Sequence, residues 1–448
     1  MHLLRLLPRF REAHRHLDVL AGRERWSRAG IATWQLERLN QVWRHASAHV
    51  PYYRRLAADV RLPEQFRSLQ EYTETMPILP RLAIKTAPED LLSDRAAPGQ
   101  WHVSSGSTGN PTRYFIERAA HREMLQCRYR MQASWGIDIL DPTASLWSAA
   151  AEHTPGPWRH LAGLRQGAVD LARNRLRLSA YHMSPADLRA HLGRLAAFQP
   201  AMLYAYSTAG YLLAREAEAT AFRCDRLELC VLSAEPASPH MVATVERAFG
   251  VPAVVEYGAT ECALIAGEGP DRVLRVREDL VFVETRPIAG GGHELLLTVL
   301  NNPSFPFLRY AIGDITDRPI DTPEKGFAVL SNVTGRSNDL LATRTGRVLH
   351  PLRFEFLFSR SLAKAVRYYR IHQARDGSVS AVVSASEPVP ARDLARLKQE
   401  LEALLEGYPV TVQLVDALPD QPRKHRWTTS DMLLEPNPLL QTADTRGG

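Results

Sequence analysis

Residues 227–261 read LELCVLSAEPASPHMVATVERAFGVPAVVEYGATE, and this stretch decides the fold class of the chain. An apolar, β-rich run at 227–233 precedes a helical pattern at 240–249, and a second β-rich run follows at 253–257. Strand, helix and strand in this order are typical of a parallel sheet with helices on its faces. The stretch therefore predicts an α/β fold.

Both predicted strands end in polar residues. Ser233 and the segment 234–236 end the first strand, and the segment 256–261 ends the second. Ligands of open parallel sheets bind at the carboxyl ends of the strands. We therefore expect both segments to contribute to a binding site.

The same alternation of strand and helix patterns extends from residue 141 to residue 300. Its other members are β-rich runs at 144–147, 201–204 and 294–300 and helical patterns at 188–198 and 211–219. Such a repeat predicts a large N-terminal domain with parallel-rich sheets flanked by helices. The chain has 448 residues, which is longer than a single hydrophobic core usually supports. We therefore expect a second domain.

The pattern changes beyond residue 338. Strand, strand, helix and strand follow each other at 366–372, 379–384, 391–405 and 410–415, a compact α+β pattern. We therefore predict an N-terminal domain at 1–337 and a small, mobile C-terminal α+β domain at 338–448. In the N-terminal domain, residues 1–20 and 119–135 have helical patterns, and a helix in 34–57 is expected to close in a turn at Pro51.

A run of hydroxyl residues and glycines, VSSGSTGNPT at 103–112, lies between an irregular approach and the predicted helix at 119–135. Gly106 and Gly109 let the backbone turn sharply, so that successive N–H groups point at one anion. The same concavity gains hydroxyl donors from Ser104, Ser105, Ser107 and Thr108. The stretch is read as a phosphate cradle or, taken alone, as an ordinary Ser/Gly turn. It is not a Walker loop, because it contains no lysine.

Composition limits the classes of protein and of partner. No window approaches the roughly 18 apolar residues of a membrane-spanning helix. The net charge of +6 comes mainly from arginines spread along the chain, which argues against nucleic acid as a partner. The four cysteines, Cys127, Cys224, Cys230 and Cys262, are too scattered for a disulfide framework or paired zinc ligands. A reducing, cytoplasmic location fits this usage best.

Taken in order, five segments resemble the adenylate-forming superfamily of acyl-CoA synthetases, adenylation domains and luciferases. They are 104–112, 234–236, 256–261, 308–316 and 335–339. The nearest likeness is to the branch of phenylacetate-CoA ligase, coenzyme F390 synthetase and CapK, of which a helix ending in HVPYYRRL, here at 49–56, is typical. The resemblance implies that ATP activates a carboxylic acid to an acyl-adenylate with release of pyrophosphate, and that a second nucleophile then takes the acyl group.

The resemblance assigns roles to the N-terminal segments position by position. The cradle would hold the β- and γ-phosphates, with Ser107 and Thr108 nearest the pyrophosphate. Tyr257 would stack on the base beside Gly258, Thr260 would bind the α-phosphate, and Glu261 would hold Mg²⁺. The segment along the adenine would be Ala234, Glu235 and Pro236. Without the resemblance, the alternative for Tyr257 is a core aromatic residue, and the alternative for Glu261 is a solvated loop carboxylate.

Four residues further along the chain also receive roles. Asp314 would accept both ribose hydroxyls, since an ionised carboxylate is an acceptor with two oxygens. Arg336 would reach the ribose or a phosphate, and Lys424 would bridge the carboxylate and the α-phosphate. Asn338 occupies the hinge position, about which the small domain would rotate. Taken alone, Asp314 is a Gly-Asp turn residue and Lys424 a solvated loop lysine.

The branch favours an aromatic or arylacetic acid as substrate and CoA as acceptor. A carrier-protein thiol, an amine, or a hydroxyl that accepts AMP remain open, as does a nucleotide-binding scaffold that has lost turnover. Asn110 and Asn338 depart from the residues more usual in relatives, lysine and aspartate. Many members of the branch carry a Cys/His zinc cluster, but Cys262 stands alone, so we expect no structural zinc.

Overall fold

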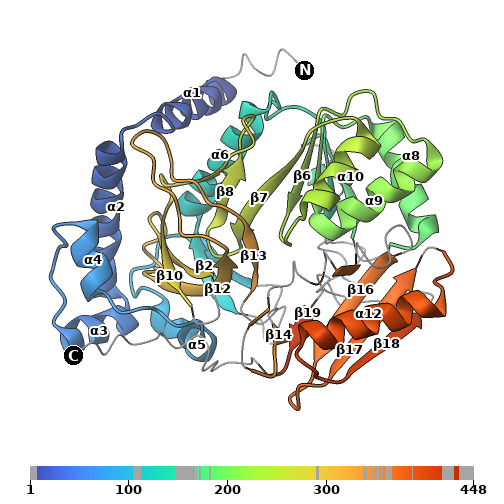
Figure 1. The fold of residues 1–448 in the computed structure, drawn as a ribbon. Helices are drawn as coiled ribbons and strands as arrows, with labels where there is room; N and C mark the ends of the chain where they lie inside the picture. The colour runs from blue at the N-terminus through green and yellow to red at the C-terminus, as the bar shows by residue number, and fades with distance from the viewer. Residues whose placement is uncertain are drawn as a thin grey trace, which may run out of the picture. The chain divides into compact units, whose positions relative to one another are not determined.

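The computed structural model describes residues 8–103, 112–147, 167, 169–170, 173–180, 183–288, 292–336, 341–345, 348–349, 354, 357–358, 366–385, 387–415 and 428–432. Figure 1 shows its ribbon. The chain divides into two units. Unit 1 comprises residues 1–283, 297–310 and 320–330, and unit 2 comprises residues 284–296, 311–319 and 331–448. The single boundary at 338 stays a prediction.

Unit 1 begins with helices. They are α1 (Pro8–Arg23), α2 (Arg28–His49), α3 (Pro51–Val60), α4 (Leu69–Thr75), α5 (Arg81–Thr86) and a short 3-10 helix (Pro88–Leu91). The expected turn at Pro51 is wrong, because Pro51 is the first residue of α3. Proline favours this position, where its missing N–H has no helical partner to lose.

A β-hairpin replaces the irregular approach expected before the Ser/Gly stretch. Strand β1 (Gly99–Val103) pairs antiparallel with β2 (Arg113–Glu117), and Val103 lies opposite Arg113. The two ends of the segment 104–112 are thus held side by side by the strands. Helix α6 (Arg118–Ser134) follows, as predicted.

Among the described residues of unit 1, seven strands form one sheet in the order β4-β3-β5-β6-β7-β8-β9. The strands from β4 to β7 in this order pair in parallel, whereas β8 pairs antiparallel with both β7 and β9. The strands are β3 (Thr143–Trp147), β4 (Arg175–Ser179), β5 (Met202–Tyr206), β6 (Leu229–Ser233), β7 (Ala253–Ala259), β8 (Ala263–Glu268) and β9 (Leu274–Val276). The connecting helices are α8 (Pro185–Phe198), α9 (Ser207–Thr220) and α10 (Pro239–Phe249). The predicted parallel α/β arrangement is confirmed.

Helices cover both faces of this sheet (Figure 1). On one face, Met131 of α6 packs in a buried cluster with Val231 and Val254. Leu232 points to the other face, since successive strand residues alternate. There a Cβ on Gly210 of α9 would lie 2.8 Å from the Leu232 side chain, so a glycine permits this close approach.

A second sheet has the order β10-β11-β12-β13 in the described part of the chain. Its strands are β10 (Val281–Pro287), β11 (His293–Val299), β12 (Tyr310–Thr316) and β13 (Val333–Arg336). The strand predicted at 294–300 is β11. Unit 2 includes β13 and most of β12.

The remainder of unit 2 has the α+β pattern predicted beyond 338. Strands β18, β17, β16 and β19 lie in this order, and α12 (Ala391–Leu404) packs Leu397 and Leu401 into a core with Ile371 and Val383. The strands are β14 (Leu341–Ala342), β15 (Val348–Leu349), β16 (Val366–Gln373), β17 (Val379–Ala385), β18 (Val410–Val415) and β19 (Thr428–Ser430). The sequence did not reveal β19, which pairs in parallel with β16. No helix in the described ranges is long and apolar enough to cross a bilayer.

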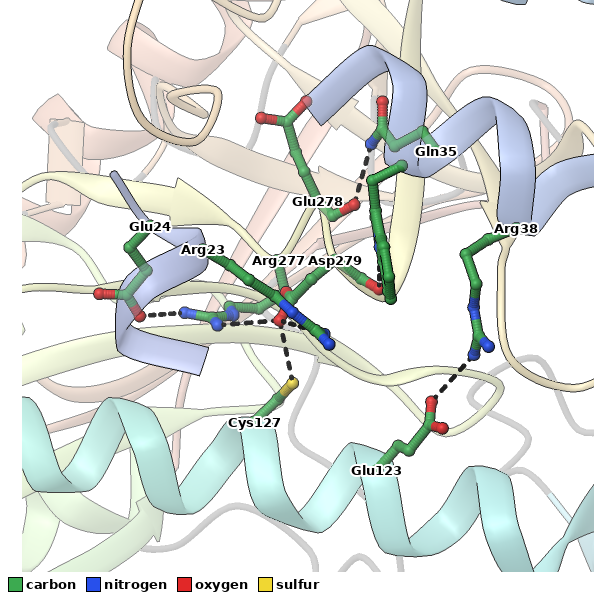
Figure 2. A network of polar contacts seen from close by, with 10 residues as sticks. Arg23, Glu24, Gln35, Arg38, Glu123, Cys127, Arg277, Glu278 and Asp279 are labelled. Atoms are coloured by element: carbon green, nitrogen blue, oxygen red, sulfur yellow. Dashed lines mark hydrogen bonds and ion pairs between the residues drawn. The ribbon is translucent and has the colours of Figure 1, made fainter. Parts of the chain in front are cut away.

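A buried polar network fastens the N-terminal helices to the rest of unit 1 (Figure 2). Arg277 donates to Glu24 at 2.7 Å and to Asp279 at 3.4 Å, and both Arg277 and Asp279 are almost fully buried. The thiol of Cys127 on α6 also contacts the Asp279 carboxylate at 3.8 Å. Arg277 therefore neutralises a carboxylate that has little access to solvent.

We predict that Arg277→Ala lowers the free energy of unfolding by about 3–5 kcal/mol, because removing the nearer partner of the buried Asp279 carboxylate leaves Arg23, at 3.8 Å, as the one cation beside it among the described residues. Urea titration measures the loss. Arg275→Ala is the matched control, since Arg275 pairs with Asp271 at an exposed position and its loss costs about 1 kcal/mol or less. Equal losses in the two variants would contradict the prediction.

Candidate functional site

The segment after β7 forms a tight turn that carries two of the predicted site residues. Strand β7 ends at Ala259, whose carbonyl accepts a hydrogen bond from the N–H of Cys262, and β8 starts at Ala263. Tyr257 lies in β7 and is 9% exposed. Thr260 and Glu261 lie within the turn, so the strand pairing fixes their position.

The Glu261 carboxylate is buried and faces two hydroxyl groups. The Thr260 hydroxyl donates to Oε2 at 3.0 Å, and the Tyr310 hydroxyl donates to Oε1 at 3.4 Å. Glu261 itself is 6% exposed, which contradicts the alternative of a solvated loop carboxylate. Its two oxygens form a hard donor set of the kind that suits Mg²⁺.

Tyr114 joins the same group from the hairpin. Burial, together with the nearby Glu261 carboxylate, raises the pKa of Tyr114, and its hydroxyl is hydrogen-bonded to Thr260. The hydroxyl thus stays protonated at neutral pH. The His102 ring stacks on Tyr114 with a centroid distance of 5.8 Å, and the two residues are partners in the β1–β2 register.

This contact places the two ends of the Ser/Gly segment near the Thr260–Glu261 turn. His102 precedes the segment by two residues, and Tyr114 follows Thr112 by two. The cradle residues Ser104, Ser105, Gly106, Ser107, Thr108 and Gly109, and Asn110 with them, lie outside the described residues. Their phosphate-binding role stays a prediction.

The segment after β6 has a left-handed backbone and a capping carboxylate. Ala234 has φ 69°, a conformation that costs a residue with a Cβ energy and is common at functional sites. The Glu235 carboxylate accepts the N–H of Thr208 at 3.0 Å, at the start of α9. The Glu235 side chain therefore caps a helix, while Pro236 is exposed. The adenine contact predicted for this segment remains a prediction.

In unit 2, the register of β12 and β13 brings two predicted site residues together. Asp314 lies directly opposite Arg336 in this antiparallel pair. Gly313, with φ 82°, precedes Asp314, and Asp314 is 7% exposed. Residues 22 positions apart in the chain are thus neighbours across the sheet. Asn338 and Lys424 lie outside the described residues.

Two tyrosines of the Glu261 group were missed by sequence reasoning. Tyr310 lies in the quoted 308–316 segment, and Tyr114 flanks the Ser/Gly stretch, but nothing in their spacing indicates a shared partner. Tyr310 is 49 residues from Glu261 in the chain. Only the folded sheets bring their hydroxyls to the Thr260–Glu261 turn.

The comparisons with known proteins find no matching family model. The phenylacetate-coenzyme A ligase of Aromatoleum evansii is 26% identical over 414 residues, which are 85% of this chain and 87% of that enzyme. Protein CapK of Staphylococcus aureus is 28% identical over 176 residues, but the alignment spans only 38% of this chain and 39% of CapK.

A solved structure gives the fold an independent comparison. The crystal structure of 2-hydroxyisobutyryl-CoA ligase, in the postadenylation state in complex with 2-HIB-AMP, matches with a TM-score of 0.73 over 91% of each chain. The two sequences are 20% identical. This likeness shows a shared fold.

Within the described ranges, no three His, Cys, Asp or Glu side chains gather closely enough to hold a metal. Cys262, the cysteine after Glu261, is buried and forms no disulfide. We predict that elemental analysis of the purified protein finds far less than one zinc per chain, because a structural zinc site needs four ligands, usually cysteine and histidine. One zinc per chain after dialysis against a chelator would contradict this prediction.

Proposed function

We propose that the chain is an AMP-forming acid-CoA ligase of the adenylate-forming superfamily, in the branch of phenylacetate-CoA ligase and CapK, to which its relatives belong. ATP would activate a carboxylic acid to an acyl-adenylate, with release of pyrophosphate, and CoA would take the acyl group. The observation that carries the proposal is the Glu261 group. It sets a buried carboxylate and two hydroxyls beside the ends of the Ser/Gly segment.

The residues of unit 1 are suited to the triphosphate. Nucleotidyl transfer depends mainly on positioning and neutralising charge. Glu261 would hold Mg²⁺, which neutralises part of the phosphate charge. Thr260, held by its contacts with Glu261 and Tyr114, would bind the α-phosphate. Tyr257 would stack on the base beside Gly258 and the segment 234–236, and Ser104–Thr112 would cradle the β- and γ-phosphates.

The residues of unit 2 are suited to the sugar. Asp314 would accept both ribose hydroxyls, and Arg336, its partner in the register, would reach the ribose or a phosphate. Residues 338–448, with Asn338 as hinge, would form the domain that brings Lys424 to the reacting carboxylate and removes it afterwards. Such a gating step lets the second nucleophile enter.

The acid we propose is aromatic or arylacetic, and the acceptor is CoA. A pyrophosphate-release assay over a panel of carboxylic acids, run with and without CoA, tests both. If pyrophosphate release depends on the acid but the activated product reacts only with an amine, a carrier-protein thiol or a hydroxyl, that nucleophile replaces CoA as the acceptor. None of the four cysteines, all of which are described, forms a disulfide, which suits a reducing cytoplasm, and there we place the protein.

We predict that Lys424→Ala lowers the rate of adenylation by about 10²-fold or more while ATP still binds, because a contact made in the transition state affects rate more than ground-state affinity. Pyrophosphate release measures the rate, and calorimetry measures ATP binding. Lys398→Ala is the matched control, since Lys398 is a half-exposed lysine of α12 that pairs with Glu402. An unchanged adenylation rate in Lys424→Ala would show that this lysine is misassigned.

Asp314→Ala should instead weaken nucleotide binding. Each lost hydrogen bond to the carboxylate costs about 1.5–3 kcal/mol, so the ATP dissociation constant should rise by about tenfold or more. Isothermal titration calorimetry measures the change, with Asp321→Ala, at an exposed position, as control. Wild-type affinity in Asp314→Ala would refute the ribose assignment.

A further inference from the structure

The last paired row of the parallel sheet presents an aromatic ring, a hydroxyl and a carboxylate side by side. Tyr206 of β5 is in register with Ser233 of β6, and Ser233 is in register with Glu256 of β7. The Trp147 ring, at the end of β3, stacks on Tyr206 with a centroid distance of 3.8 Å. This row lies at the carboxyl ends of the strands, where ligands of such sheets bind.

Glu256 lies on the sheet face that α6 covers. It is two residues after Val254, which packs against Met131 of α6, and alternate strand residues share a face. Arg128, three residues before Met131 on the same helix face, donates to Glu256 Oε1 at 3.0 Å. The Tyr204 hydroxyl donates to the same oxygen at 2.7 Å.

The two donors converge on one carboxylate oxygen, and the other has no donor in the part of the chain that the structure describes. The Glu256 side chain is 0% exposed, and no described residue donates a hydrogen bond to its Oε2. Burial raises the pKa of the Tyr204 hydroxyl, which therefore stays protonated and donates to Oε1. A buried carboxylate oxygen without a donor is costly, so this oxygen needs a partner such as a water molecule or a ligand.

Glu278, another buried glutamate in unit 1, forms an ion pair in which both carboxylate oxygens have donors. Both oxygens of Glu278 are occupied, by the Arg28 guanidinium at 2.6 and 3.0 Å and by the N–H of Ala328 at 2.6 Å. Asp279 also has an oxygen without a donor among the described residues, but Arg23 and Arg277 lie against its other oxygen. The Trp26–Trp34 pair beside it meets edge to face and is not stacked. Glu256 is distinguished by an open acceptor beside stacked rings at a ligand-binding edge.

We propose that Glu256 Oε2 accepts a hydrogen bond from a hydroxyl or amino group on the body of the acid substrate. The proposal rests on the proposed function and narrows the substrate class to aromatic acids that carry such a donor. Tyr257, the residue proposed for the base, points to the opposite face of β7, because successive residues alternate. The group at Glu256 therefore belongs to the acid, whose ring would lie by Trp147 and Tyr206.

A site built around a buried acceptor rejects a ligand that lacks the donor, since the acceptor is then left unpaired. We expect at least one hydroxy- or amino-substituted acid to bind the wild-type protein about tenfold more tightly, or better, than the same acid without the substituent. Isothermal titration calorimetry with a non-hydrolysable ATP analogue present measures this. The probes are benzoate, phenylacetate and their ortho, meta and para hydroxy and amino derivatives, which separate the two donor types.

Two variants locate the preference. The double variant Arg128→Met/Glu256→Met removes both charges together, which avoids an unpaired buried charge. It should bind the unsubstituted acids at least as well as the wild type and lose the preference for donors. Tyr204→Phe, which removes a donor to Oε1 only, should keep the preference. Thermal unfolding of each variant and its ATP affinity show whether the fold is intact.

Equal binding of substituted and unsubstituted acids by the wild type would overturn this inference. If these acids still give pyrophosphate release, the proposed function stands without it. A preference that survives in the double variant would also overturn the inference, because the donor would then be recognised elsewhere. Failure of every acid to bind would overturn it too, and the separate pyrophosphate-release assay would then judge the proposed function.

Discussion

The parallel register of β5, β6 and β7 is the constraint on which the rest of unit 1 depends. It brings Ser233 and Glu256 to one row, so the polar segments after β6 and β7 start at the same edge of the sheet. Helices α6 and α9 pack on opposite faces of these strands, and polar side chains lie at the carboxyl ends of the strands. A slip by one residue would turn every side chain of a strand to the other face.

The antiparallel strand pairs position the remaining candidate residues. The β7–β8 turn carries Thr260 and Glu261, and the β1–β2 hairpin brings Tyr114 to them. In unit 2, the β12–β13 register sets Asp314 against Arg336 in the same manner. The backbone of each candidate segment is thus held by strand pairing, and the buried Glu261 carboxylate keeps its hydroxyl partners before a ligand binds. Such preorganisation is what electrostatic catalysis requires.

Sequence reasoning predicted the strands and helices between 201 and 257, because their apolar runs are separated by clear helical patterns. It missed β19, which has three residues, and the start of α3 at Pro51, where a proline suits a helix start as well as a turn. The contacts of Glu256 could not be predicted, because Arg128 and Tyr204 are 128 and 52 residues away in the chain. Motif spacing indicates where a carboxylate lies, whereas its partners depend on packing.

The most direct test of the account is a crystal structure with a non-hydrolysable acyl-adenylate analogue bound. We expect the analogue at the carboxyl ends of β5, β6 and β7, with its base against Tyr257, its ribose hydroxyls on Asp314 and its acyl group on the α6 face of the sheet. An analogue bound at the opposite edge of the sheet, or one that leaves Asp314 and the Thr260–Glu261 turn untouched, would contradict the account.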